Sequence, residues 1–214
     1  MQATRILAIR HGETAWNVDT RIQGQLDIPL NETGLQQARW MAQALAERDA
    51  LQAIYASDLS RAHVTAQTLA SQVGLAVTAH TGLRERAFGD FQGRTFAEIE
   101  VELPDDAHHW RKRTPEWTPP GAGESLIALR ERVLATVDEL AARHVGQQIA
   151  LVAHGGVMDV LYRAATRLDL QAPRTWPLTN TAVNRLLWTP QGLSLVGWGD
   201  TSHLDALGQD ETTA

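Results

Sequence analysis

The feature that most constrains the fold of this chain is an apolar run that ends in His-Gly and occurs twice, far apart. Residues 5–9 (RILAI) lead into Arg-His-Gly at 10–12, and residues 149–153 (IALVA) lead into His-Gly-Gly at 154–156. Both runs are predicted to be buried strands. If the two strands lie in one parallel sheet, both histidines lie at its carboxyl edge, where open α/β sheets bind ligands. Two imidazoles and Arg10 at one edge would suit a phosphoryl group.

Strand and helix patterns alternate along the remaining chain, which favours βα units around a mainly parallel sheet. Helices are predicted over residues 33–48, 59–73, 125–143 and 155–168, with a short helix that opens on a capping box at Thr95. Strands are predicted over 53–56, 75–78 and, as a closing hairpin, over 183–189 and 193–198. The sequence has no internal repeat and no linker, so we expect one domain over residues 1–214.

The composition excludes several classes of protein. The 214 residues are 43% hydrophobic, carry a net charge of −6 and contain no cysteine. An acidic chain without a basic stripe is not expected to bind nucleic acid, and a chain without cysteine forms neither disulfides nor thiolate metal sites. The apolar runs are too short to cross a membrane, and the first strand begins too early to leave room for a signal peptide. We therefore expect a cytoplasmic protein.

His11 is the first candidate for chemistry. A neutral imidazole is a competent nucleophile toward phosphorus, and a phosphohistidine is labile enough to be hydrolysed in a second step. Gly12 permits a tight turn and a close approach of the backbone to an anion. An isolated Arg-His-Gly is more often a strand-end histidine that only hydrogen-bonds, but the full string RHGETAWN at 10–17 and its counterpart at His154 favour the functional interpretation.

Arg61 and Glu85 are further candidates. Arg61 lies at the start of a predicted helix, where the helix dipole and its own charge both attract an anion. Glu85 follows a strand and a loop, and a carboxylic acid near the ester oxygen would protonate the leaving group. By spacing alone, however, Glu85 is better described as a member of an exposed charge cluster.

Metal chemistry is the competing interpretation. The pairs Asp105-Asp106 and His108-His109 lie close together in the sequence, but adjacent residues do not face one ligand on a helix or a strand. The sequence has neither His-x-His nor His-Glu-x-x-His spacing. We predict no metal site and no cofactor.

A set of motifs follows in order along nearly the whole chain. The motifs are RHGET at 10–14, Asn17, Gln23-Gly24, Arg61, Leu83-Arg84-Glu85, His154-Gly155 and DTSHL at 200–204. Together they resemble the histidine phosphatase superfamily, in its cofactor-dependent phosphoglycerate mutase-like branch. The resemblance implies an α/β fold, a three-layer sandwich with a mainly parallel central sheet.

The resemblance also implies roles for the catalytic residues. By analogy His11 would be the phosphorylated nucleophile and Glu85 the proton donor. Arg10, Arg61 and His154 would hold the phosphoryl oxygens.

A second group of residues is expected to contact the substrate, and two of them, the Gln-Gly pair, would line the entrance. These residues are Asn17, Thr14, Gln23, Gly24 and Gly155.

The activity that the resemblance implies is that of a metal-independent phosphomonoesterase, which hydrolyses a small phosphorylated metabolite through a phosphohistidine. Glycolytic mutases of this branch carry a longer insertion after the catalytic glutamate, with a Tyr and a Lys that help retain the bisphosphate intermediate, whereas the short segment 86–93 here has neither. A phosphoglycerate mutase is the alternative. A non-catalytic phospho-ligand binding protein is a third hypothesis, against which the intact histidine and glutamate argue. The resemblance also allows a homodimer, and it leaves the substrate and the role of His63 open.

Residues 104–123 form the segment that is hardest to interpret. They contain four prolines, two tryptophans and the run Arg111-Lys112-Arg113, without a hydrophobic period. Long irregular segments are often lids or binding loops, while isolated charge runs are usually solvated. Two hypotheses follow: a lid whose basic run meets a second acidic group on the substrate, or a solvated crossover.

Overall fold

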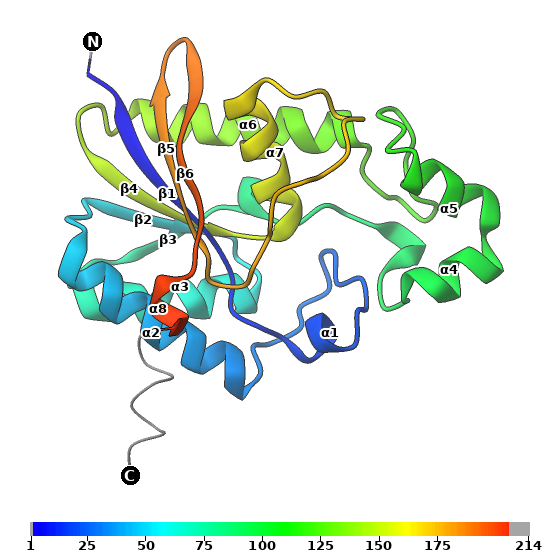
Figure 1. Cartoon of the computed structure of the whole chain (residues 1–214), viewed down its shortest axis with the longest axis horizontal. Coiled ribbons are helices and arrows are strands. Elements are labelled where there is room, and N and C mark those ends of the chain that lie inside the picture. The colour runs from blue at the N-terminus through cyan, green and yellow to red at the C-terminus, as the bar shows by residue number, and fades with distance from the viewer. Residues whose placement is uncertain (1, 206–214) are drawn as a thin grey trace.

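A computed structural model describes residues 2–205 of the chain (Figure 1). Its strands are β1 (Thr4–Arg10), β2 (Ala53–Ala56), β3 (Val77–Ala79), β4 (Gln148–Ala153), β5 (Val183–Thr189) and β6 (Gly192–Asp200). Its helices are α1 (Ala15–Val18), α2 (Glu32–Arg48), α3 (Ser60–Val73), α4 (Phe96–Glu102), α5 (Pro104–Arg111), α6 (Leu126–Ala142), α7 (Gly155–Thr166) and α8 (Ser202–Asp205). None of these described helices combines the length and the hydrophobicity that a bilayer span requires.

The strands form one six-stranded sheet in the order β3-β2-β4-β1-β5-β6. The pairs β2–β3, β2–β4 and β1–β4 are parallel, and the predicted closing hairpin of β5 and β6 adds the antiparallel pairs β1–β5 and β5–β6. In the register of the central pair, Arg10 lies opposite Ala153. The residues that follow, His11 and His154, therefore leave the sheet side by side at its carboxyl edge.

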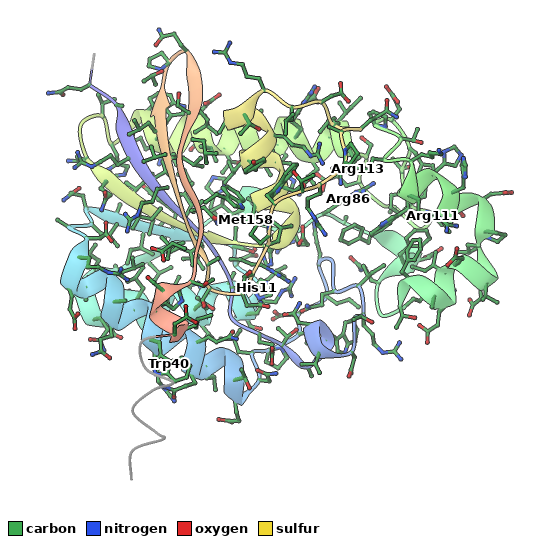
Figure 2. All side chains as sticks on the ribbon, viewed as in Figure 1. His11, Trp40, Arg86, Arg111, Arg113 and Met158 are labelled. Carbon is green, nitrogen blue, oxygen red and sulfur yellow. The ribbon has the colours of Figure 1, made fainter. Side chains whose placement is uncertain are left out.

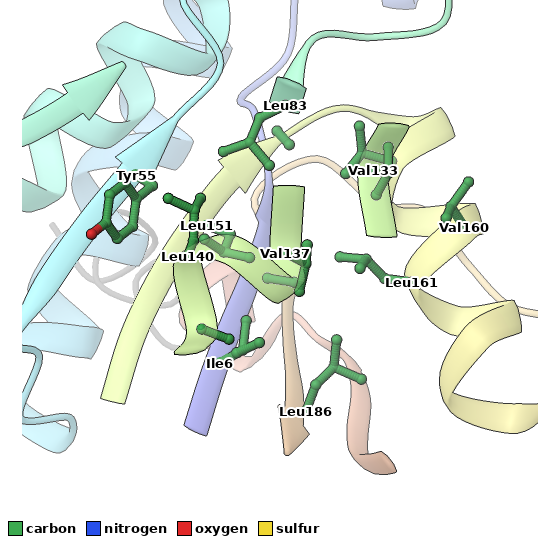
Figure 3. Close-up of a cluster of buried hydrophobic side chains, with 14 of the residues drawn as sticks. Ile6, Tyr55, Leu83, Val133, Val137, Leu140, Leu151, Val160, Leu161 and Leu186 are labelled. Carbon is green, nitrogen blue, oxygen red and sulfur yellow. The ribbon is translucent and has the colours of Figure 1, made fainter. Parts of the chain in front are cut away.

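Helices cover both faces of the sheet because side chains alternate between the faces along each strand. Ile6 and Ala8 of β1 pack with α6 and α7 on one face, and Figure 3 shows this cluster with Val133, Val137 and Leu140 of α6 labelled. Leu7 and Ile9 pack with α2 and α3 on the other face. The predicted three-layer α/β sandwich is confirmed.

The helices α4 and α5 lie beside the sandwich and enclose a small apolar cluster of their own (Figure 1). The absence of a hydrophobic period predicted an irregular chain from residue 104, and this was wrong for Pro104–Arg111, which form α5. Proline is favoured in the first turn of a helix, and the acidic first turn and basic last turn of α5 complement the helix dipole. Only Ala107 of α5 is buried, so the helix has no apolar stripe for a periodicity search to find.

Candidate active site

The two histidines at the ends of β1 and β4 form the centre of the site. Their ring centroids are 5.1 Å apart, and His11 is labelled in Figure 2. The His11 Nδ1 lies 2.7 Å from the Gly12 carbonyl oxygen. Since a carbonyl only accepts, Nδ1 carries the proton and donates it, which leaves the Nε2 lone pair free. A Cβ on Gly12 would lie 2.4 Å from the Gly34 carbonyl oxygen, so only glycine fits there.

Burial and positive neighbours keep both rings neutral. Burial lowers the pKa of His11 well below its ordinary value, and the charges of Arg10 and Arg61 lower it further. Burial, followed by the charge of Arg61, lowers the pKa of His154 in the same way. Neither ring nitrogen of His154 has a hydrogen-bond partner within residues 2–205. Two neutral imidazoles with free nitrogens suit an incoming anion that both accepts hydrogen bonds and reacts.

The two arginines of the site are each anchored by the outer nitrogens of the guanidinium. Arg10 donates from Nη1 to the Leu178 carbonyl, and Arg61 donates to the carbonyls of Leu26 and Gly24 at 2.8 and 2.7 Å. The buried Nε of each arginine has no partner in the described structure. Burial lowers the pKa of Arg61 to about 10, so it remains charged at neutral pH. A guanidinium whose buried Nε lacks a partner is expected to bind an anion.

The predicted entrance residues have different surroundings. Gly24, in a left-handed conformation with φ of 54°, presents its carbonyl oxygen to Arg61 and so acts as a support for that side chain. Gln23 is buried, and its Oε1 has no hydrogen-bond partner among residues 2–205. Neither residue lines the cavity of about 400 Å³ that Arg10 and Glu85 border.

Thr14 and Asn17 hold the loop after His11 in shape. The Thr14 Oγ1 accepts from the Asn17 amide at 3.1 Å and the Asn17 Oδ1 accepts from the Thr14 amide at 3.1 Å, which makes a capping box at the start of α1. Asn180 joins them by donating to the His11 carbonyl at 2.8 Å and to the Asn17 Oδ1 at 3.3 Å. Thr14 and Asn17 thus hold the backbone that follows His11 in shape, and their contact with a substrate stays a prediction.

Glu85 is held at the start of α7 by three backbone contacts. Its carboxylate accepts from the Gly156 amide at 3.1 and 3.0 Å and from the Arg86 amide at 2.8 Å. A Cβ placed on Gly155 would lie 3.8 Å from both the Glu85 Oε2 and the Arg10 Nε. The carboxylate, the arginine and the N-terminus of α7 thus surround one point, beside a cavity of about 400 Å³.

The comparison with protein families decides the identity of this arrangement. The model of the histidine phosphatase superfamily (branch 1) matches residues 6–201. The chain belongs to the histidine phosphatase superfamily.

Individual histidine phosphatases resemble the chain over most of its length. A phosphoglycerate mutase-like protein 4 of Arabidopsis thaliana is 37% identical over 95% of this chain and 88% of its own. A metal-independent phosphoserine phosphatase of the same plant is 35% identical over 97% and 86%. A solved structure of a mycobacterial glucosyl-3-phosphoglycerate phosphatase has a TM-score of 0.82 and 35% identity, and the match covers 92% of this chain and 99% of that one. Two of these three relatives carry the names of phosphatases of small phosphorylated compounds, the class of activity that the resemblance implies.

The structure adds residues to the site of this histidine phosphatase that the sequence reasoning missed. Asp159 and Arg174 line the cavity beside Glu85, together with the predicted Gly155 and with Arg113 of the basic run that the sequence had singled out. Arg132 donates to the carbonyls of Gly82 and Arg84, at 2.9 and 3.0 Å, and so fixes the chain that leads to Glu85. The place of Asn180 at the site follows from the pairing of the strands. Because β5 pairs antiparallel with β1, the residues just before β5 must lie at the edge where β1 ends.

Two residues of the basic run, Arg111 and Arg113, line a second cavity of about 520 Å³. This cavity shares Arg113 and Arg174 with the first. Figure 2 shows Arg111 on the side of the molecule that α4 and α5 form. Arg111 lines the second cavity and pairs with Glu100 at 2.5 Å, whereas Lys112 lines neither cavity.

The acidic and histidine pairs at 105–109 lie on α5. Within residues 2–205, no group of three or more His, Cys, Asp or Glu side chains is arranged to hold a metal ion.

Proposed function

We propose that this histidine phosphatase is a metal-independent phosphomonoesterase, which transfers the phosphoryl group of a small metabolite to His11 and then to water. One observation carries the proposal. The neutral His11 has a free Nε2, the charges of the half-buried Arg10 and the buried Arg61 act on its ring, and the Nε of each arginine has no partner within residues 2–205. A nucleophile and the donors that stabilise a phosphoryl transition state are therefore preorganised at one place.

In the first step, the His11 Nε2 forms a bond to phosphorus as the ester P–O bond breaks. Arg10 and Arg61 bind the equatorial oxygens and stabilise the charge that gathers on them, and His154 contributes a further hydrogen bond. Glu85, protonated, gives its proton to the departing alkoxide. The free alcohol leaves, and the phosphoryl group remains on His11.

In the second step, a water molecule attacks phosphorus while the N–P bond breaks. The Glu85 carboxylate accepts the proton that this water loses, so one residue serves as acid and then as base. Glu85 is suited to this exchange because three backbone amide contacts fix its carboxylate while it borders the open cavity.

The covalent intermediate gives the decisive test. His11→Ala is expected to remove nearly all phosphate release, and brief reaction of the native protein with labelled ester should leave an acid-labile, base-stable label on His11. His108→Ala is a suitable histidine control, since His108 is exposed on α5. An acid-stable adduct, or full activity in His11→Ala, would refute the mechanism.

The remaining alternative, a mutase, is distinguished from a phosphatase by its products. With 3-phosphoglycerate, a phosphatase releases phosphate and a mutase yields the isomer without net phosphate.

Activity is also expected to persist after prolonged incubation with EDTA. Loss of activity with EDTA that a divalent cation restores would contradict the metal-independent part of the proposal.

A further inference from the structure

Thr65 is a buried residue of α3 whose hydroxyl group joins two parts of the site that lie far apart in the chain. Its Oγ1 donates a proton to the Arg61 carbonyl at 2.7 Å, one turn earlier in the same helix. The same oxygen accepts from the Gly12 amide at 3.1 Å, across 53 residues. Thr65 and Gly12 are both buried, and a buried amide needs a partner within the protein. One hydroxyl thus connects the helix that carries Arg61 to the loop that carries His11.

The peptide group between His11 and Gly12 is held from both ends. Its carbonyl, that of His11, accepts from the Asn180 side chain at 2.8 Å, and its amide, that of Gly12, donates to Thr65. Because a peptide group is planar, these two hydrogen bonds together fix its orientation. That orientation sets the ψ of His11 and the φ of Gly12, two torsions that determine where the ring and the next carbonyl lie relative to each other.

The next carbonyl, that of Gly12, sets the chemistry of the nucleophile. It accepts from the His11 Nδ1 at 2.7 Å. This contact keeps the proton on Nδ1 and the lone pair on Nε2, the atom that attacks phosphorus in the proposed mechanism. A tilt of the preceding peptide group would carry the Gly12 carbonyl away from the ring, and the imidazole would then no longer be held in one tautomer.

Packing requires a glycine at position 12, and a glycine leaves the backbone free to rotate. A Cβ on Gly12 would lie 2.4 Å from the Gly34 carbonyl at the start of α2, and α2 and α3 pack side by side on one face of the sheet (Figure 1). Since glycine restricts its own φ and ψ less than any other residue, the loop must be fixed by contacts from outside. Thr65 supplies such a contact from the helix next to it.

We infer that Thr65 is a positioning residue, which acts through the peptide group between His11 and Gly12 to hold the His11 ring in the tautomer and orientation that phosphoryl transfer needs. Thr65 lines neither cavity and acts on the reaction only through the backbone. The inference rests on the proposed phosphohistidine mechanism and adds to it a residue from behind the site.

Thr65→Val keeps the size and branching of the side chain and removes both of its hydrogen bonds. With nitrophenyl phosphate and the protein in saturating excess, the rate of nitrophenolate release in a single turnover reports formation of the N–P bond. We expect this rate to fall about ten- to a hundredfold, because a small displacement of a reacting group has an effect of that size. The inhibition constant of inorganic phosphate should change little, because the side chains of Arg10 and Arg61 are anchored on other carbonyls.

Two further substitutions separate positioning from a general effect on the helix. Thr65→Ser keeps the hydroxyl and should restore what Thr65→Val loses. Thr68→Val is the matched control, since the Thr68 hydroxyl donates to the Val64 carbonyl at 2.9 Å, four residues back, just as Thr65 does to Arg61. Within residues 2–205 Thr68 forms no hydrogen bond to the loop after β1, so its replacement should leave the single-turnover rate unchanged.

The His11 ring gives a readout that a purely structural role would not change. In protein labelled isotopically at the histidine nitrogens, the ring nitrogen shifts of His11 at neutral pH can be assigned by their loss in His11→Ala. They should be those of the tautomer with its proton on Nδ1. Thr65→Val should move them toward the values of a mixture of both tautomers, whereas Thr65→Ser and Thr68→Val should not.

The outcomes separate this inference from the function on which it rests. A native single-turnover rate or an unchanged His11 ring spectrum in Thr65→Val, or an equal loss of rate in Thr65→Ser or Thr68→Val, would overturn the role of Thr65 and leave the phosphatase mechanism intact. A native protein that releases no nitrophenolate would overturn the mechanism and this inference together.

A second pair of variants decides the question if Thr65→Val does not fold. Thr65→Ser and Thr65→Cys have the same shape but differ in the strength of the acceptor, and the chain contains no other cysteine that could form a disulfide. The single-turnover rate should fall in the cysteine variant alone. Equal rates in the two variants would overturn the inference.

Discussion

Several side chains of the site use some of their polar atoms for structure and leave one atom over for chemistry. His11 fixes its Nδ1 on the Gly12 carbonyl and keeps Nε2 free. Arg61 donates from both Nη atoms to loop carbonyls, and its buried Nε has no partner in the part of the chain that the structure describes. Such anchoring limits the rotamers that a side chain must give up when the substrate binds, which is the physical meaning of preorganisation.

The role of Glu85 as a proton donor can be tested by one substitution. Glu85→Gln keeps the shape of the side chain but removes the proton that it gives to the leaving group. Hydrolysis of an alkyl phosphate should fall by about 10²–10⁴-fold, because a poor leaving group needs protonation. Hydrolysis of nitrophenyl phosphate, whose leaving group is a stable anion, should fall much less. Equal losses in kcat for the two esters would show that Glu85 has another role.

At the scale of elements, the start of α7 determines where the acid sits. The helix begins directly after His154, and its amide at Gly156 binds the Glu85 carboxylate at 3.1 and 3.0 Å. A Cβ on Gly156 would lie 2.2 Å from the Glu85 Oε1, whereas a Cβ on Gly155 would meet its neighbours at 3.8 Å or more. Two adjacent glycines thus differ in what they permit, and only Gly156 is required for the approach of the carboxylate.

This difference predicts opposite results for two neighbouring alanine variants. Gly156→Ala should displace Glu85 and reproduce the leaving-group dependence of Glu85→Gln. The free energy of unfolding should stay nearly unchanged, because the preference of alanine for a helix, about 1 kcal/mol, offsets the contacts that Glu85 loses. Gly155→Ala should keep the native leaving-group dependence. The ratio of alkyl phosphate to nitrophenyl phosphate rates in both variants checks this. If both ratios match that of the native protein, Glu85 is not positioned by the approach to Gly156.

For the whole molecule, the burial of two histidines among arginines makes stability depend on pH. The pKa values of His11 and His154 lie well below 6.5 in the folded state, chiefly through burial. The unfolded chain therefore binds more protons as the pH falls below about 6.5, and the folded state loses stability there.

We expect the free energy of unfolding, measured by urea titration without phosphate, to decrease between pH 7 and pH 5. Each histidine contributes at most about 1.4 kcal/mol per pH unit. His154→Asn should reduce the slope, while the same change at the exposed His108 should leave it unaltered. An unchanged slope in His154→Asn would mean that the buried ring does not govern the acid sensitivity.

The sequence by itself determined the features that depend on neighbours along the chain. An apolar strand followed by His-Gly places a histidine at a sheet edge wherever it occurs, so the paired His11 and His154 and the α/β class could be predicted from their two short segments. The family motifs then added Arg61 and Glu85, for which local spacing gave little or no support. The bounds of the four long helices α2, α3, α6 and α7 followed closely from periodicity and caps, as with the left-handed Gly74 at the end of α3, whereas α5, which has no apolar stripe, did not.

Only the tertiary structure decided the features that depend on partners far apart in the chain. Asp159 meets Arg113 across 46 residues, and Asn180 reaches the His11 carbonyl across 169. The sequence around Arg174 contains no period or motif that separates it from other exposed arginines. Local patterns record which face of an element is buried, whereas a substrate cavity is formed by side chains from several elements, and their meeting depends on how the elements pack.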